Sequence, residues 1–153
     1  MTFSNKKQKL KSPRYIAITT LINWYKTGHL TMPKRESFLE RRDYSFTVCL
    51  IQTCLRHQSR FHYFIEILSG KKHEKLDIEA VSAINLGMAQ LSEISGVPAH
   101  AAIFETVALL PMVGKSYLKK FVNAILRRYQ REEQALLAEV QQSSLAIWSS
   151  HPE

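Results

Sequence analysis

Glycine and proline are scarce in this chain, with five of each among its 153 residues. A β-sandwich or barrel needs a turn every few residues, and glycine and proline supply most of those turns. Their scarcity therefore disfavours a turn-rich β architecture and favours helices. The length is enough for one domain and too short for two of ordinary size.

Long apolar runs are also absent from the sequence. The stretch AAIFETVALLPMVG, residues 101–114, is interrupted by Glu105 and Pro111. It therefore falls short of the ~18 apolar residues that span a bilayer. No apolar segment follows the N-terminal lysines, so the N-terminus does not fit a secretory signal peptide. We expect a cytoplasmic protein with no membrane partner.

Cysteine occurs only twice, and its spacing matches no metal or redox motif. Cys49 and Cys54 lie five residues apart, which is neither the spacing of a zinc site nor that of a Cys-x-x-Cys pair. We expect two buried, unpaired thiols, as is usual for proteins of a reducing compartment.

Motifs that would carry out catalysis are absent as well. The isolated glycines form no nucleotide-binding loop, and the six histidines form no HExxH pattern. His100 stands at a predicted helix start, where it is expected to cap or pack. Glu105 lies among apolar residues and is expected to be a buried carboxylate that accepts hydrogen bonds. The sequence thus predicts no catalytic residue, no metal ligand and no cofactor site in this chain.

Positive charge, in contrast, is abundant, with a net charge of +8. Much of it lies in the first fourteen residues, which contain no acid and five cations: Lys6, Lys7, Lys9, Lys11 and Arg14. We expect residues 1–12 to form a flexible basic leader. Such a segment can neutralise RNA phosphates and become ordered as it binds.

The hydrophobic pattern has a helical period along the rest of the chain. It predicts helices over residues 13–28, 38–57, 61–70, 76–94, 99–110, 115–131 and 132–145. No segment alternates with the two-residue period of a strand. The fold class is therefore predicted to be all-α, with six or seven helices.

The predicted helix over residues 115–131 has two unlike faces. Leu118, Phe121, Val122, Ile125 and Tyr129 form an apolar seam that is expected to pack into the core. The opposite side carries three cations: Lys120, Arg127 and Arg131. Two interpretations of this outer stripe remain open, a solvated surface or an RNA-binding surface. Further cations around the second helix add to the RNA interpretation: Arg41, Arg42, Arg56, His57 and Arg60.

The segments VPAHAAIFETVALL and KKFVNAILRR, within residues 97–128, resemble the signature of the NusB-like helical domain. LDIEAVSAINLGMAQLSEIS is similar to the central helix of that family, and PRYIAITTLINWYKTG to its opening helix. The resemblance covers residues 13–135 and implies a NusB-like helical bundle that binds RNA. Three places depart from the family pattern: Thr53, Asn85 and the pair Phe104–Glu105.

Within this family, the chain is most similar to the N-terminal domain of small-subunit rRNA cytosine-5 methyltransferases of the RsmB (Sun/Fmu) type. The ending LAIWSSHPE resembles the phrase that leads into their catalytic domain. Residues 136–153 are therefore expected to form a linker helix toward a catalytic domain outside this chain. The resemblance implies that this domain uses S-adenosylmethionine and a cysteine nucleophile, which is neither Cys49 nor Cys54.

The resemblance implies that the chain docks an rRNA substrate, with the catalytic domain as its partner in cis. The residues expected to contact RNA are Lys6, Lys7, Lys9, Lys11, Arg14, Lys120, Arg127 and Arg131. A homodimer is left open. One alternative is a free NusB-type antitermination factor that binds RNA and a ribosomal protein. Another is a protein-interaction module whose basic surface only keeps it solvated.

Overall fold

The computed structural model describes residues 12–150, and the side chains of residues 12–142. The predicted leader and its four lysines lie outside this range. The α-helices are α2 (Pro13–Thr27), α3 (Arg41–Arg56), α4 (Gln58–Ser69), α5 (Ile78–Ser92), α6 (Ala99–Val107), α7 (Leu109–Met112) and α8 (Lys119–Ser150). The 3-10 turns are η1 (Arg35–Ser37), η2 (His73–Lys75) and η3 (Ser116–Leu118).

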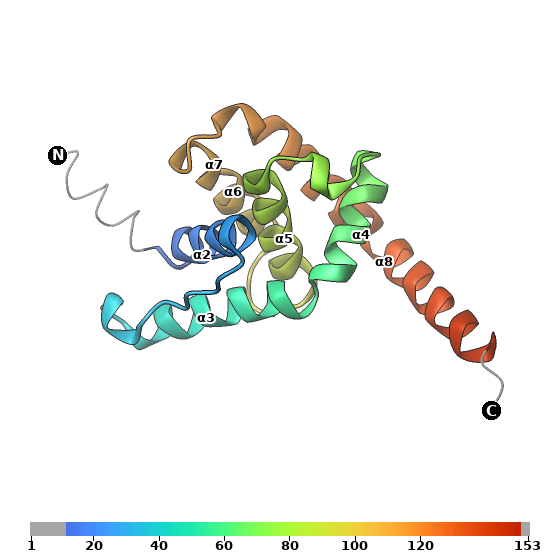
Figure 1. The fold of residues 1–153 in the computed structure, drawn as a ribbon, viewed down its shortest axis with the longest axis horizontal. Helices are drawn as coiled ribbons and strands as arrows, with labels where there is room; N and C mark the ends of the chain where they lie inside the picture. The colour runs from blue at the N-terminus through green and yellow to red at the C-terminus, as the bar shows by residue number, and fades with distance from the viewer. Residues whose placement is uncertain (1–11, 151–153) are drawn as a thin grey trace.

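All regular structure in residues 12–150 is helical, and no strand occurs among them (Figure 1). The predicted all-α class is confirmed, and so are six or seven helices, since α7 is a single turn. None of the helices described is long and apolar enough to cross a membrane.

Local sequence explains where several helices begin and end. The Ser12 hydroxyl accepts a hydrogen bond from the Tyr15 amide (3.2 Å) and caps α2, whose first residue is Pro13. Gly28, with φ +77°, ends α2 in a left-handed conformation that costs glycine little. Gly70 ends α4 in the same way. The predicted ends of the helices over residues 13–28 and 61–70 are thereby confirmed.

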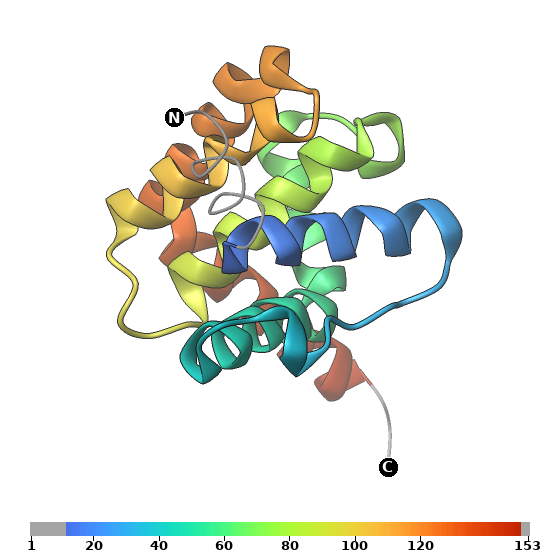
Figure 2. The same cartoon turned by 90° about the vertical axis from the view of Figure 1, so that its left-hand side faces the viewer.

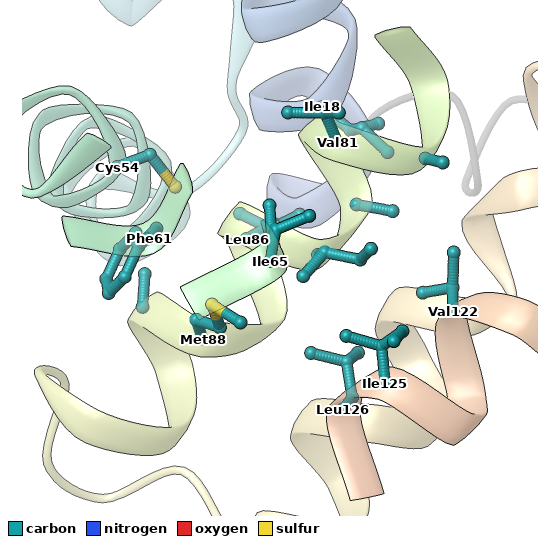
Figure 3. Packing of buried hydrophobic residues seen from close by; sticks show 14 of the residues in the cluster. Ile18, Cys54, Phe61, Ile65, Val81, Leu86, Met88, Val122, Ile125 and Leu126 are labelled. Atoms are coloured by element: carbon teal, nitrogen blue, oxygen red, sulfur yellow. The ribbon is translucent and has the colours of Figure 1, made fainter. Parts of the chain in front are cut away.

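Helix α5 is the central element, surrounded by α2, α3, α4, α6 and α8 (Figure 2). Every residue from Glu79 to Gln90 is buried. A helix that is apolar on most sides is expected at the middle of a helical domain, and that placement is confirmed. Figure 3 shows side chains of four helices meeting around it: Ile18, Phe61, Ile65, Val81, Leu86, Met88, Val122, Ile125 and Leu126.

Helices α5 and α8 approach closely at Gly87. A Cβ atom at this position would lie 2.5 Å from Cδ2 of Leu126, which is fully buried. Glycine is therefore required by the closeness of the two helices, while its backbone has ordinary helical angles.

Helix α8 is continuous, so the predicted break between residues 131 and 132 is wrong. No glycine or proline occurs from Lys115 to Ser150, and nothing in the sequence ends the helix. The apolar seam also continues past the predicted break, with Leu136 buried and Val140 partly buried against the core. The last turns of α8 extend away from the other helices in Figure 1.

Three other local predictions were wrong in their details. Helix α3 begins at Arg41 instead of Phe38, and its buried positions are Thr47, Leu50, Ile51 and Cys54. Cys54 is buried as expected, whereas Cys49 points away from the core and is exposed. The predicted helix over residues 99–110 is interrupted at Ala108, between α6 and α7.

Candidate nucleic-acid interface

The first four turns of α8 separate apolar and cationic side chains. Leu126 and Tyr129 are fully buried against the rest of the bundle. Lys120, Arg127 and Arg131 are exposed. Their spacings of seven and four residues keep them on one side of a helix with 3.6 residues per turn. The structure thus places these three predicted contact residues on one surface stripe.

The connection between α4 and α5 contacts both η3 and α8. At its start, Nη1 of Arg128 donates a hydrogen bond to the carbonyl oxygen of Leu68 (2.8 Å). At its end, the Tyr117 hydroxyl donates to the carboxylate of Asp77, the residue that precedes α5. Figures 1 and 2 show the connection at the same end of the molecule as α7 and η3.

The same connection carries three exposed lysines, Lys71, Lys72 and Lys75. Because Arg128 of α8 bonds to the start of this connection, we group its lysines with the cations of α8 as one surface. We call it the basic face, and its members are Lys71, Lys72, Lys75, Lys120, Arg127, Arg128 and Arg131.

Residues 71–75 fall between the predicted helices over residues 61–70 and 76–94, and their three lysines were not among the predicted RNA contacts. The only local signal was the run GKKHEK. That this run lies beside α8 is a tertiary fact, which hydrophobic periodicity cannot supply.

Acidic side chains near the basic face are already engaged. Glu66 accepts hydrogen bonds from the backbone amide (3.1 Å) and Nδ1 (2.6 Å) of His73, and the amide contact is the main cause that holds the pKa of Glu66 below its ordinary value. Glu132 accepts from Nε of Arg128 (2.6 Å). Among the described residues, no carboxylate lies within 4.0 Å of the three lysines of the connection or of Lys120, Arg127 and Arg131. These six cations are therefore free to meet an anion.

Arg14 lies elsewhere and is already occupied by the core. Its Nε donates to Oε1 of Gln90 (2.7 Å), and its guanidinium lies 5.4 Å from the ring centre of Phe46. Burial lowers the pKa of Arg14, and the charge of Glu105 partly opposes this. Gln90 and Asp77 stand at opposite ends of α5, about 20 Å apart at 1.5 Å per residue. The structure does not bring Arg14 together with the basic face.

The predicted cations around α3 do not form one cluster either. Arg41 and Arg42 open the helix, whereas Arg56 closes it about 20 Å away. Arg42 pairs with Glu40 (3.1 Å). At the other end, Arg60 pairs with Glu93, which also lies 3.6 Å from Nε2 of His57.

A polar group at the α4–α5 connection could hold a ligand. Glu66, His73 and Glu74 bring two carboxylates and one imidazole within 4.8 Å of one another. His62 stacks on His73 with 4.2 Å between ring centres, and burial, followed by the charge of His73, lowers the pKa of His62 to about 4. The hydrogen bonds from His73 to Glu66 satisfy the central carboxylate, so this group has a structural role in fixing the connection.

Side chains considered for chemistry in the sequence do not assemble into a catalytic centre in the part of the chain that the structure describes. Burial raises the pKa of the Cys54 thiol, which makes it a poor nucleophile. Glu105 is exposed, so the expectation of a buried carboxylate is wrong. Its neighbours Ile103 and Thr106 are buried, because they lie on the side of α6 that packs against the core, whereas Glu105 lies on the other side.

Comparison with known proteins identifies the family of this chain. The model of the NusB family matches residues 11–131. This match agrees with the helical signature in the sequence and with the all-helical bundle.

Three relatives carry related names. Ribosomal RNA small subunit methyltransferase B of Pseudomonas syringae pv. tomato is 29% identical over 136 residues, which cover 89% of this chain and 30% of the relative. The protein of the same name from Enterobacter sp. is 27% identical over 148 residues, covering 97% and 34%. A probable ribosomal RNA small subunit methyltransferase B of Synechocystis sp. is 35% identical over 92 residues, covering 60% and 21%. The chain spans about a third of the length of the first two relatives.

Proposed function

Since the chain belongs to the NusB family, we propose that it is an RNA-binding domain whose basic face contacts RNA phosphates. The observation that carries this proposal is the junction of two basic segments distant in sequence, the α4–α5 connection and the outer stripe of α8. Six cations there have no carboxylate within ion-pairing distance among the described residues. Lysine and arginine side chains arranged in this way gain affinity for nucleic acid by releasing its condensed counterions.

The RNA in this proposal is ribosomal, and the chain acts as the docking part of an rRNA cytosine-5 methyltransferase. The names of the relatives support this context, and each of them is much longer than the matched region. Methyl transfer from S-adenosylmethionine to cytosine would belong to the remainder of such an enzyme. Residues 13–135 would dock the RNA, residues 1–12 would add cations, and residues 136–153 would lead toward the catalytic part.

Phosphate contacts position an RNA without reading its sequence. The basic face would therefore hold the substrate and orient it. Selection of the target cytosine would fall to RNA shape or to the catalytic part. A free antitermination factor of the same family remains the alternative, and the methyltransferase names of the relatives favour the docking role over it.

The proposal is tested by measuring affinity for a fluorescent fragment of small-subunit rRNA. The triple variant Lys120→Ala/Arg127→Ala/Arg131→Ala is expected to bind about 10- to 100-fold more weakly at physiological salt, because three phosphate contacts are lost. The control Lys34→Ala/Arg41→Ala/Arg42→Ala removes the same charge from exposed positions before and at the start of α3. Equal losses in both variants would contradict a localised RNA site, and no binding by the unmodified chain would end the proposal.

A further inference from the structure

An exposed aromatic ring stands at the edge of the basic face. Tyr117 lies on η3, immediately before α8, and 68% of its surface is exposed. Single exposed rings are common on protein surfaces, so this one is informative only through what surrounds it. Here the ring has a cationic neighbour, Lys115. Asp77, which the Tyr117 hydroxyl contacts, follows Lys75 by two residues in the sequence. This combination of ring and cations differs from an apolar patch suited to a protein partner.

Two contacts hold the Tyr117 side chain, and a third joins the two residues that make them. Its hydroxyl donates to the Asp77 carboxylate, and Nζ of Lys115 lies 5.7 Å from its ring centre. The same lysine lies 3.8 Å from Asp77. The loop that leads into η3 is also fixed, since the Lys115 amide donates a hydrogen bond to the Leu110 carbonyl (2.8 Å). A ring ordered before binding loses little conformational entropy when a ligand covers it.

The chemistry of the hydroxyl keeps this arrangement stable at neutral pH. The hydrogen bond to Asp77 is the main cause that raises the pKa of Tyr117. The ring therefore stays neutral and continues to donate its proton to Asp77. A neutral, exposed ring among ammonium groups is the arrangement used to stack nucleobases while cations hold the backbone.

From this arrangement we infer that Tyr117 stacks on an unpaired base, so that the basic face binds single-stranded or looped RNA in preference to a duplex. This inference rests on the proposed function. Bases inside a duplex are stacked on one another and cannot cover the ring, whereas unpaired bases can. Phosphates of either RNA form can meet the lysines and arginines. The ring, and not the charge, therefore discriminates between them.

The test compares a 12-nucleotide single-stranded RNA with a blunt 12-base-pair duplex at one salt concentration. The unmodified chain is expected to bind the single strand more tightly. Tyr117→Ala is expected to weaken single-strand binding by about 5- to 100-fold, the range for loss of one stacked base, and to leave duplex binding nearly unchanged. Tyr117→Phe keeps the ring and is expected to retain most of the single-strand affinity.

Phe104→Ala is the matched control, because Phe104 is 70% exposed on α6 and belongs to neither segment of the basic face. Thermal melting of each variant would establish that it is folded. If both RNAs bind but Tyr117→Ala leaves single-strand affinity unchanged, the inference is overturned and the proposed function survives. If neither RNA binds the unmodified chain, the proposed function fails first, and a protein partner becomes the better explanation of the ring.

Discussion

Single polar residues inside the bundle differ in how well their hydrogen bonds are satisfied. Gln90 is fully engaged, because its amide donates to the Leu86 carbonyl (3.0 Å) and the Thr106 hydroxyl (2.9 Å) and accepts from Arg14 (2.7 Å). The Tyr129 hydroxyl is buried and forms no hydrogen bond of ordinary geometry with the residues that the structure describes, although the nearby Ser92 hydroxyl acts to lower its pKa. Burial is the main cause that raises the pKa of Tyr129 to about 12.

Removing the Tyr129 hydroxyl should therefore cost nothing. Tyr129→Phe is expected to leave the free energy of unfolding unchanged or to raise it by up to about 1 kcal/mol, since an unpaired buried hydroxyl is itself unfavourable. Tyr25→Phe is the control, because the Tyr25 hydroxyl accepts from Nδ2 of Asn85 (2.8 Å). That variant is expected to lose about 1–2 kcal/mol. Urea denaturation measures both, and a loss above 1 kcal/mol in Tyr129→Phe would reveal a partner for its hydroxyl.

His62 makes stability depend on pH. Its surroundings are the Tyr25 hydroxyl and Asn85 at 3.3 and 3.2 Å, the stacked ring of His73, and the carboxylates of Glu66 and Glu74. Burial and the charge of His73 lower the pKa of His62 to about 4 in the folded chain. The two carboxylates act in the opposite direction but are smaller causes. The unfolded chain has an ordinary histidine pKa near ~6.5 and therefore binds the proton first.

Stability should accordingly be complete above pH 6.5 and fall as pH decreases toward 4. Between pH 7 and pH 5, His62→Gln is expected to lose about 1 kcal/mol less than the unmodified chain, after allowance for the partial exposure of His62. Urea denaturation at the two pH values measures this difference. Equal losses in both proteins would show that His62 does not titrate as described.

At the scale of helices, local signals predicted starts and stops better than they predicted continuity. The helices predicted over residues 13–28 and 61–70 end at Gly28 and Gly70, where glycine adopts the left-handed conformation that ends a helix. The break predicted between residues 131 and 132 does not exist, because no glycine or proline there interrupts the helix. Cys49 and Glu105 were misjudged for a related reason. Each has apolar neighbours in the sequence but lies on the side of its helix that faces away from the core of the domain.

The crossing of α5 and α8 gives the sharpest prediction at this scale. Gly87→Ala is expected to destabilise the chain by about 1–3 kcal/mol, because the new methyl group would lie 2.5 Å from the fully buried side chain of Leu126, which would have to shift. This exceeds the gain of about 1 kcal/mol that alanine offers in a helix. Thermal or urea denaturation measures the change.

Leu126→Ala provides the control for that crossing. The truncation alone removes a fully buried side chain and costs stability, but it also removes the atoms that the Gly87→Ala methyl group would strike. The double variant is therefore expected to lose less than the sum of the two single losses. Additive losses, or a Gly87→Ala variant as stable as the unmodified chain, would contradict the close approach.

At the scale of the whole molecule, the fold brings together charges that the sequence keeps apart. The stripe of Lys120, Arg127 and Arg131 followed from helical periodicity alone and is confirmed as an exposed stripe. The lysines of the α4–α5 connection could not be added to it from the sequence, since their place depends on how α4 and η3 pack beside α8. Arg14 was grouped with the leader by position, whereas Gln90 holds it at the far end of α5.

The most direct measurement of the central claim is RNA affinity as a function of salt concentration. For the unmodified chain, the logarithm of the association constant should fall linearly with the logarithm of salt concentration, by about 0.7 per phosphate contact on a single strand. In Lys120→Ala/Arg127→Ala/Arg131→Ala this slope should become smaller by about 2, since three contacts are lost. The control Lys34→Ala/Arg41→Ala/Arg42→Ala should keep the full slope. A triple variant of α8 with an unchanged slope would show that RNA does not lie on the basic face.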